Sequence, residues 1–134
     1  MDPVKILVVD DETLFLTPLV QRLKLRKHDA HGVRSGEEAL EFLRDHPDTE
    51  VVLLDMKLPG MSGIQTLEKI KKLPPLVEVI ILTGHASLEA GKKGLQLGAY
   101  DFLLKPVKLA DILEKIQGAR DRRLARIEAG VYTK

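Results

Sequence analysis

The sequence has no cysteine and no tryptophan among its 134 residues, and only 4% of its residues are aromatic. The lack of cysteine excludes a disulfide framework and any metal site built from thiolates. It is also typical of proteins from a reducing compartment, so we expect the protein in the cytoplasm. The scarcity of aromatic residues argues against a stacking platform for single-stranded nucleic acid and against an aromatic cage for cations.

Long apolar runs and an excess of charge of either sign are missing as well. No apolar stretch approaches the roughly 20 residues that a membrane-spanning helix needs, and we expect no membrane partner. Lys and Arg total 21 against 20 Asp and Glu, for a formal charge of +1, so the chain as a whole has no electrostatic bias toward nucleic acid. With 44% hydrophobic and 31% charged residues, the composition fits one globular domain. Function is therefore expected in a local site.

Several short and mostly continuous apolar runs have the pattern of strands that are buried on both faces of a sheet. Helical patterns separate them. This alternation predicts right-handed β-α-β units and a doubly wound α/β domain with a parallel sheet. The expected strands are Val4–Val9, Val51–Leu54, Val77–Leu82 and Phe102–Leu104, with a weaker one around Ala30–Val33.

The helices have recognisable starts. Ser35 with Glu38, and Ser62 with Gln65, form two predicted capping boxes. Pro18 lies inside the first helical pattern, which predicts either a start near Thr17 or a kink. Gly91 and Gly94 weaken the fourth helical pattern by about 1 kcal/mol each relative to Ala, so we expect residues 87–97 to be mobile.

The last helix is predicted from the apolar residues after Pro106, and no proline prevents its continuation through Ile127. We divide the chain into a domain of residues 4–118 and a helical extension of residues 119–134. The extension is rich in arginine, which we attribute to favourable charge near a helix C-terminus, with a nucleic-acid or membrane patch as the less favoured reading. The arginines are Arg120, Arg122, Arg123 and Arg126.

Polar side chains follow four of the predicted strands. Asp10 and Asp11 follow the first, Asp55 the third, Thr83 the fourth and Lys105 the last. Because ligands of open α/β sheets bind beyond the carboxyl ends of the strands, we expect these side chains to share one site. Each has a simpler explanation as a cap, a turn residue or an exposed lysine, but their combination at four strand ends favours a site.

Carboxylates that lie close together repel one another unless a proton, a cation or a basic side chain is present. Oxygen ligands without His or Cys suit Mg²⁺ better than Zn²⁺. Lys105 supplies a basic group to the same edge of the sheet. We therefore expect a Mg²⁺ site that can take a phosphate.

Four segments of the sequence resemble the receiver domain of two-component response regulators. They are Val-Val-Asp-Asp-Glu (8–12), Leu-Leu-Asp-Met-Lys-Leu-Pro-Gly-Met-Ser-Gly (53–63), Leu-Thr-Gly-His (82–85) and Gly-Ala-Tyr-Asp-Phe-Leu-Leu-Lys-Pro (98–106). The resemblance covers about residues 4–118. It implies a chemotaxis-regulator-like, flavodoxin-like fold with five parallel strands in the order 2-1-3-4-5.

The resemblance also implies roles for individual residues. Asp55 matches the phosphoacceptor of a histidine kinase, Asp11 and Asp55 would ligate Mg²⁺ with the backbone carbonyl of Lys57, and Asp10 would act through water. Thr83 and Lys105 would hold phosphoryl oxygens, with the Lys105–Pro106 bond in the cis form. Thr83 and Phe102 would switch on phosphorylation, although Phe102 equally suits a plain core position. Lys57 and His85 would tune the lifetime of the phosphate.

The implied function is a phosphorylation-controlled switch in two-component signalling rather than an enzyme. The expected partners are a sensor histidine kinase or phosphotransfer protein, and a downstream protein or output domain; phosphorylation-dependent homodimers are common in such domains. Direct nucleic-acid binding is not expected. A phosphohydrolase of the haloacid-dehalogenase kind would need an Asp where Lys57 stands, and a flavodoxin-like cofactor binder would need a phosphate-cradling loop where Asp10, Asp11 and Glu12 stand.

Overall fold

A computed structural model describes residues 2–74, 76–84 and 88–130 of the chain. In these residues five strands alternate with five helices, and all neighbouring strands are parallel. The strand order is β2-β1-β3-β4-β5, so the predicted fold class and strand order are confirmed. The elements are β1 (Lys5–Val9), α1 (Thr13–Leu25), β2 (Asp29–Val33), α2 (Gly36–Asp45), β3 (Val51–Asp55), α3 (Gly63–Lys71), β4 (Glu78–Thr83), α4 (Leu88–Gln96), β5 (Asp101–Leu104) and α5 (Leu109–Glu128).

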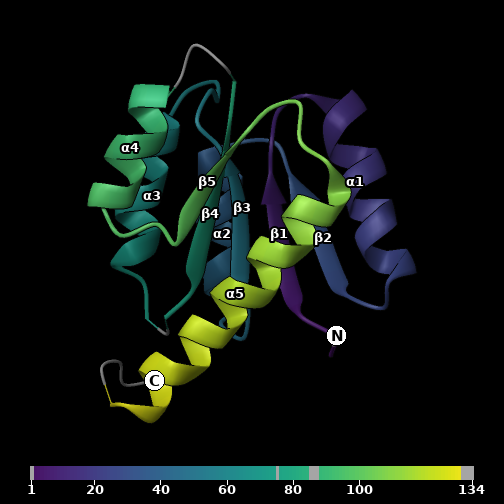
Figure 1. Ribbon diagram of the computed structural model, residues 1–134. Coiled ribbons are helices and arrows are strands. Elements are labelled where there is room, and N and C mark those ends of the chain that lie inside the picture. Colours follow the sequence, from purple (N-terminus) through teal and green to yellow (C-terminus); the bar gives the residue numbers. More distant parts are fainter. Residues whose placement is uncertain (1, 75, 85–87, 131–134) are drawn as a thin grey trace.

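Helices cover both faces of the sheet (Figure 1). On one face, α1 and α5 pack against a cluster that contains Leu23, Leu53 and Ile116. On the other, α2 and α3 pack against a cluster that contains Leu54 and Ile81. Strands β3 and β4 are buried along their whole length, which explains why their sequences read as continuous apolar runs. Among the described residues, no helix has the length and apolar character to cross a bilayer.

Three local predictions about helix starts can be compared with the structure. The capping box of Ser62 and Gln65 is present, with both hydrogen bonds formed. At α2 the box is incomplete, because Ser35 accepts from the Glu38 N–H while the Glu38 carboxylate accepts from the N–H of Arg34. A start of the first helix near Thr17 is wrong: α1 begins at Thr13 and contains Pro18.

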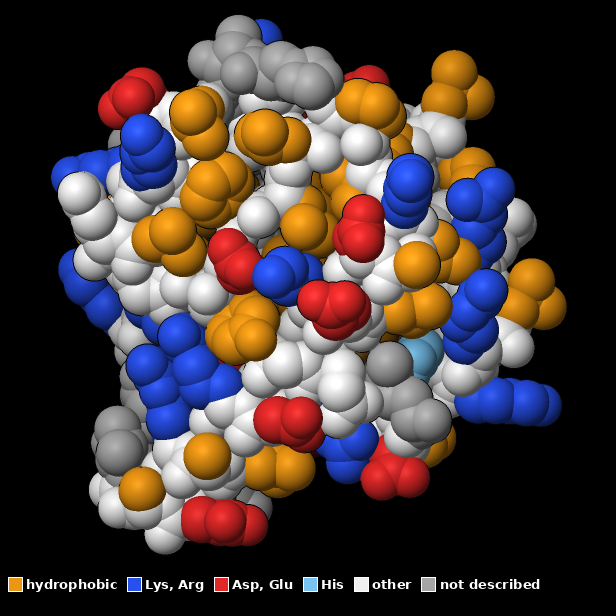
Figure 2. All heavy atoms as spheres, viewed as in Figure 1, with side chains coloured by type: hydrophobic (Ala, Val, Ile, Leu, Met, Phe, Trp, Pro, Cys, Tyr) orange, Lys and Arg blue, Asp and Glu red, His pale blue; other side chains and the backbone are white. Residues whose placement is uncertain are grey.

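The last helix continues without a break to Glu128, across the boundary that we placed after residue 118. The division into a domain and an extension stays a prediction. Apolar side chains gather on the surface over α4 and β5 (Figure 2). The most exposed large ones on these two elements are Leu88, Leu95 and Leu104, each with about two fifths of its surface accessible.

Candidate functional site

The carboxyl ends of four parallel strands bring the predicted site residues to one edge of the sheet. Asp10 directly follows β1, Asp55 ends β3 and Thr83 ends β4. Lys105 follows β5, where its backbone N–H donates to the Thr83 carbonyl at 2.6 Å. The register of the parallel strands sets the relative positions of these side chains. In this register Asp55 pairs with Leu82, and Thr83 pairs with Leu104.

Three carboxylates form the centre of this edge. Asp10, Asp11 and Asp55 each offer an oxygen, and these oxygens lie within 4.8 Å of one another. Asp10 is completely buried and Asp55 is 5% exposed, whereas Asp11 is partly open to solvent. A set of oxygen donors this close, with one side open, fits a hard divalent cation such as Mg²⁺.

Lys105 is the basic group beside the carboxylates. Its Nζ donates to Asp10 Oδ2 at 2.7 Å and lies 3.5 Å from Glu12 Oε1 and 3.8 Å from Asp55 Oδ2. The Lys105–Pro106 peptide bond is cis, as predicted. Burial lowers the pKa of Lys105, but the hydrogen bond to Asp10 and the charges of Asp55, Asp10 and Glu12 outweigh it and raise the pKa above its ordinary value. The ammonium therefore stays charged at neutral pH.

The surroundings of Asp55 shift its protonation. Burial raises the pKa of Asp55 to about 6, and the charges of Asp10 and Asp11 act in the same direction. The N–H of Lys57, which donates to Asp55 Oδ1 at 3.2 Å, and the Lys105 ammonium oppose this rise. At neutral pH the carboxylate is mostly ionised, which a nucleophile requires.

Asp10 and Asp55 differ in how they are held. Asp10 accepts two short hydrogen bonds, from the Lys105 ammonium and from the N–H of Glu12 at 2.9 Å. The ammonium approaches Asp55 only to 3.8 Å, which is beyond hydrogen-bond distance. Asp55 is thus close to a positive charge without being neutralised by a direct hydrogen bond to it.

The remaining predicted residues lie around this centre. Thr83 is buried at the same edge. The Lys57 side chain is exposed, and its backbone follows Asp55 directly into the loop before α3. Phe102 is half-buried against the core cluster of α2 and α3 and lies next to Gly91 of α4. His85 and Ser87 lie outside the described residues.

Two neighbours of the site are absent from the set that we predict from sequence. Phe15 of α1 places its ring centroid 4.3 Å from Lys105 Nζ. Arg34, which follows β2, donates from Nη2 to the Asp11 carbonyl at 3.2 Å. Neither residue stands at the end of a strand that carries a site carboxylate. Phe15 reaches the site from α1, and Arg34 reaches it from the loop after β2.

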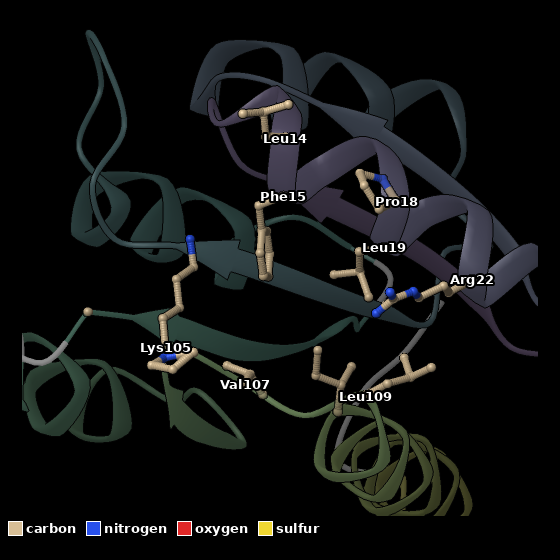
Figure 3. A pocket seen from close by; sticks show the side chains of 11 residues that line it. Leu14, Phe15, Pro18, Leu19, Arg22, Lys105, Val107 and Leu109 are labelled. Carbon is tan, nitrogen blue, oxygen red and sulfur yellow. The ribbon is translucent and has the colours of Figure 1, made fainter.

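A groove of about 640 Å³ borders the site between α1 and the segment that leads from β5 into α5 (Figure 3). Its lining is mostly apolar, and Lys105 belongs both to the groove and to the carboxylate cluster. The lining residues are Leu14, Phe15, Pro18, Leu19, Arg22, Gly84, Lys105, Pro106, Val107, Leu109 and Ile112.

Comparisons with known proteins agree with this fold. The family model of the response regulator receiver domain matches residues 6–117. The transcriptional regulatory protein ZraR of Escherichia coli (strain K12) is 35% identical over 118 residues, which are 88% of this chain and 26% of that protein. A response regulator receiver domain protein from Clostridium thermocellum has a similar crystal structure, with a TM-score of 0.86 at 35% identity over 91% of this chain and 98% of that one.

The relatives differ in what their names describe. A cyclic di-GMP phosphodiesterase of Thermotoga maritima is 34% identical over 129 residues, which are 96% of this chain and 34% of that protein. The chain thus spans about a quarter to a third of the length of these two curated relatives.

Proposed function

The chain belongs to the response regulator receiver domain family, and from this premise we propose that Asp55 accepts a phosphoryl group from a sensor histidine kinase or a phosphotransfer protein. The observation that carries the proposal is the contrast between the two buried carboxylates. Asp10 is hydrogen-bonded to the Lys105 ammonium at 2.7 Å, while Asp55 faces the same ammonium at 3.8 Å with its charge uncompensated by a hydrogen bond from it. Asp55 is therefore the carboxylate available for attack.

The proposed transfer is a displacement at phosphorus. An oxygen of Asp55 forms a bond to phosphorus while the bond from phosphorus to the donor's imidazole nitrogen breaks. That nitrogen keeps the bonding electron pair, and the imidazole leaves neutral with a proton on its other nitrogen. Such a reaction depends on positioning and charge neutralisation more than on further covalent steps.

The residues of the site divide these tasks. Asp10, Asp11 and Asp55, with the Lys57 carbonyl, would hold Mg²⁺, which supplies positive charge to the phosphoryl oxygens when bound. Lys105 supplies a second positive charge from the side of β5, and the hydroxyl of Thr83, at the end of β4, would donate to a phosphoryl oxygen. Lys57 and His85 are the positions that we expect to set the lifetime of the phosphate.

The consequence of phosphorylation that we propose is a changed surface rather than a released product. Thr83 and Phe102 would report the phosphoryl group to α4, β5 and α5. The exposed Leu88, Leu95 and Leu104 make this face suitable for a downstream protein, an output domain or a second copy of the chain. In this role the protein is a regulatory domain that assists its own phosphorylation and dephosphorylation, and we place it in the cytoplasm.

The direct test is intact mass after incubation with Mg²⁺ and acetyl phosphate. We expect one added phosphoryl group that hydroxylamine removes, and no addition to Asp55→Asn or to wild-type protein in EDTA. Beryllofluoride, which mimics the phosphoryl group without a covalent P–O bond, provides the second arm. If neither reagent changes the wild-type protein, phosphorylation is not its switch.

A further inference from the structure

The ring of Phe15 lies against the ammonium of Lys105. Phe15 stands in the first turn of α1, which begins two residues after Asp11. Its half-buried ring has its centroid 4.3 Å from Lys105 Nζ, inside the range in which an aromatic face attracts a cation (Figure 3). The ammonium thus has carboxylates on one side and an aromatic face on another.

The other contacts of the ammonium leave it incompletely fixed. Among the residues that the structure describes, only Asp10, at 2.7 Å, forms a short hydrogen bond with it. Glu12 lies at 3.5 Å, and the Glu12 side chain is 67% exposed, so water competes for this contact. Lysine carries its charge on a flexible four-carbon stem, and one hydrogen bond does not fix the direction of such a stem.

Phe15 and Lys105 both line the groove, so the ring occupies space on one side of the ammonium that groove water would otherwise fill. A ring in this place reduces contact between the ammonium and the water of the groove. A charge with less surrounding water acts more strongly on a neighbouring phosphoryl oxygen. A leucine of similar bulk would fill space but would lack the negative face of the aromatic ring.

We propose that Phe15 is a positioning residue for phosphoryl transfer, whose ring holds the Lys105 ammonium toward Asp55 and shields one side of it from water. This role rests on the proposed function of Asp55. Phe15 itself does not contact the phosphoryl group, and it acts through Lys105.

The kinetic test compares the rate of phosphorylation by acetyl phosphate in Mg²⁺ among variants. Phe15→Leu is expected to slow the reaction by about threefold to tenfold, as loss of one cation–π contact predicts. Phe15→Tyr retains the aromatic face and is expected to stay within about twofold of wild type. The matched control is Phe42→Leu, which removes a half-buried ring that stacks on His46 of the α2 C-terminus, away from the site.

Two readouts separate positioning from a general structural effect. In a Lys105→Met background, Phe15→Leu should cause no further loss of rate, because the side chain on which the ring acts is gone. In metal-free protein without any donor, the Lys105 side-chain NMR signals should show a ring-current shift in wild type and Phe15→Tyr that Phe15→Leu abolishes. Equal slowing in both backgrounds, or an unchanged Lys105 signal, overturns the proposal.

Different experimental results would overturn the two proposals. A wild-type protein that neither acetyl phosphate nor beryllofluoride changes removes the proposed function of Asp55 and, with it, the role of Phe15. A wild-type protein that is phosphorylated normally, with Phe15→Leu equally fast, removes only the role of Phe15.

Discussion

The three clustered carboxylates are chemically identical but have different surroundings. Asp10 is completely buried and tied by two short hydrogen bonds, Asp11 is partly open to solvent, and Asp55 is buried beside a cation that does not hydrogen-bond to it. Burial without full compensation is the reason that the pKa of Asp55 rises to about 6.

This pKa predicts how stability depends on pH in metal-free protein. The folded value of about 6 lies above the ordinary 3.8, so the folded protein binds the Asp55 proton more tightly than the unfolded chain does. The contribution of Asp55 is therefore most favourable below about pH 4 and is lost as the pH rises through 6, by up to about 3 kcal/mol. Asp55→Asn should exceed wild type in stability by a margin that grows between pH 4.5 and 7.5.

Urea unfolding followed by circular dichroism at several pH values in EDTA measures this margin. The comparison of two proteins at each pH cancels the titration of the other groups. A margin that stays constant from pH 4.5 to 7.5 would mean that Asp55 has an ordinary pKa.

The site carboxylates and Lys105 were predictable from sequence, because each follows an apolar run and parallel strands present their carboxyl ends together. Phe15 was not predictable in the same way. Its contact with Lys105 depends on the rotation of α1 about its axis and on where the segment after β5 passes α1. Both are set by packing of the whole domain rather than by local pattern.

Helix α5 is attached to the sheet by ion pairs in its second half. Glu78, the completely buried first residue of β4, receives hydrogen bonds from Arg122 at 2.6 and 2.8 Å. Lys71 and Arg126 lie at 3.5 and 3.7 Å from the same carboxylate. Arg123 donates to the Leu76 carbonyl at 3.0 Å. These arginines thus make tertiary contacts, which the helix-terminus explanation drawn from sequence does not include.

Glu78→Gln tests this attachment. The change removes the charge of a buried carboxylate that Arg122, Lys71 and Arg126 contact. Breaking a buried ion pair costs roughly 3–5 kcal/mol of stability, and we expect a loss at or below the lower end because these three cations are partly exposed. Amide hydrogen exchange should become faster in residues 119–128 and remain slow in residues 109–116. Lys115→Gln is the control on the same helix, since its pair with Asp101 joins two partly exposed side chains, has no buried carboxylate and contributes at most about 1 kcal/mol. Equal acceleration in both variants would contradict the special role of Glu78.

The glycines of α4 show what helix propensity alone leaves out of a prediction from sequence. A Cβ on Gly94 would lie 1.9 Å from Ile81 Cδ1, and a Cβ on Gly91 would lie 2.6 Å from the Phe102 ring. The two glycines therefore allow α4 to pack closely on β4 and β5. Propensity alone predicts a weak helix there, but it contains no information on this packing, and the mobility of residues 87–97 stays a prediction.

For the molecule as a whole, the strand order came from the resemblance and not from periodicity. Alternating strands and helices predict a doubly wound sheet, but the apolar runs of β1, β3 and β4 are too alike to say which strand lies in the centre. The exposed residues of β2 explain the weaker pattern at the sheet edge.

Binding of Mg²⁺ should stabilise the entire fold, because the cation binds folded protein and not the unfolded chain. At a hundred times the dissociation constant this gain is about 2.7 kcal/mol. We expect Mg²⁺ to raise the Tm at pH 7.5, and to raise it less at pH 5, where a proton on Asp55 competes. Thermal scans with NaCl at matched ionic strength provide the control. An equal rise in NaCl would show screening rather than a site.

The unequal distribution of charge over the molecule also has a kinetic consequence. Asp10, Asp11, Glu12 and Asp55 with Lys105 and Arg34 give the site edge a formal charge of −2, so the other residues together carry +3 to reach the total of +1. The site edge is thus locally negative in a nearly neutral protein, and its field draws cations to the edge and repels dianionic phosphoryl donors. Encounter with the two reactants is therefore expected to be ordered, with the cation arriving first and weakening the repulsion that the donor meets.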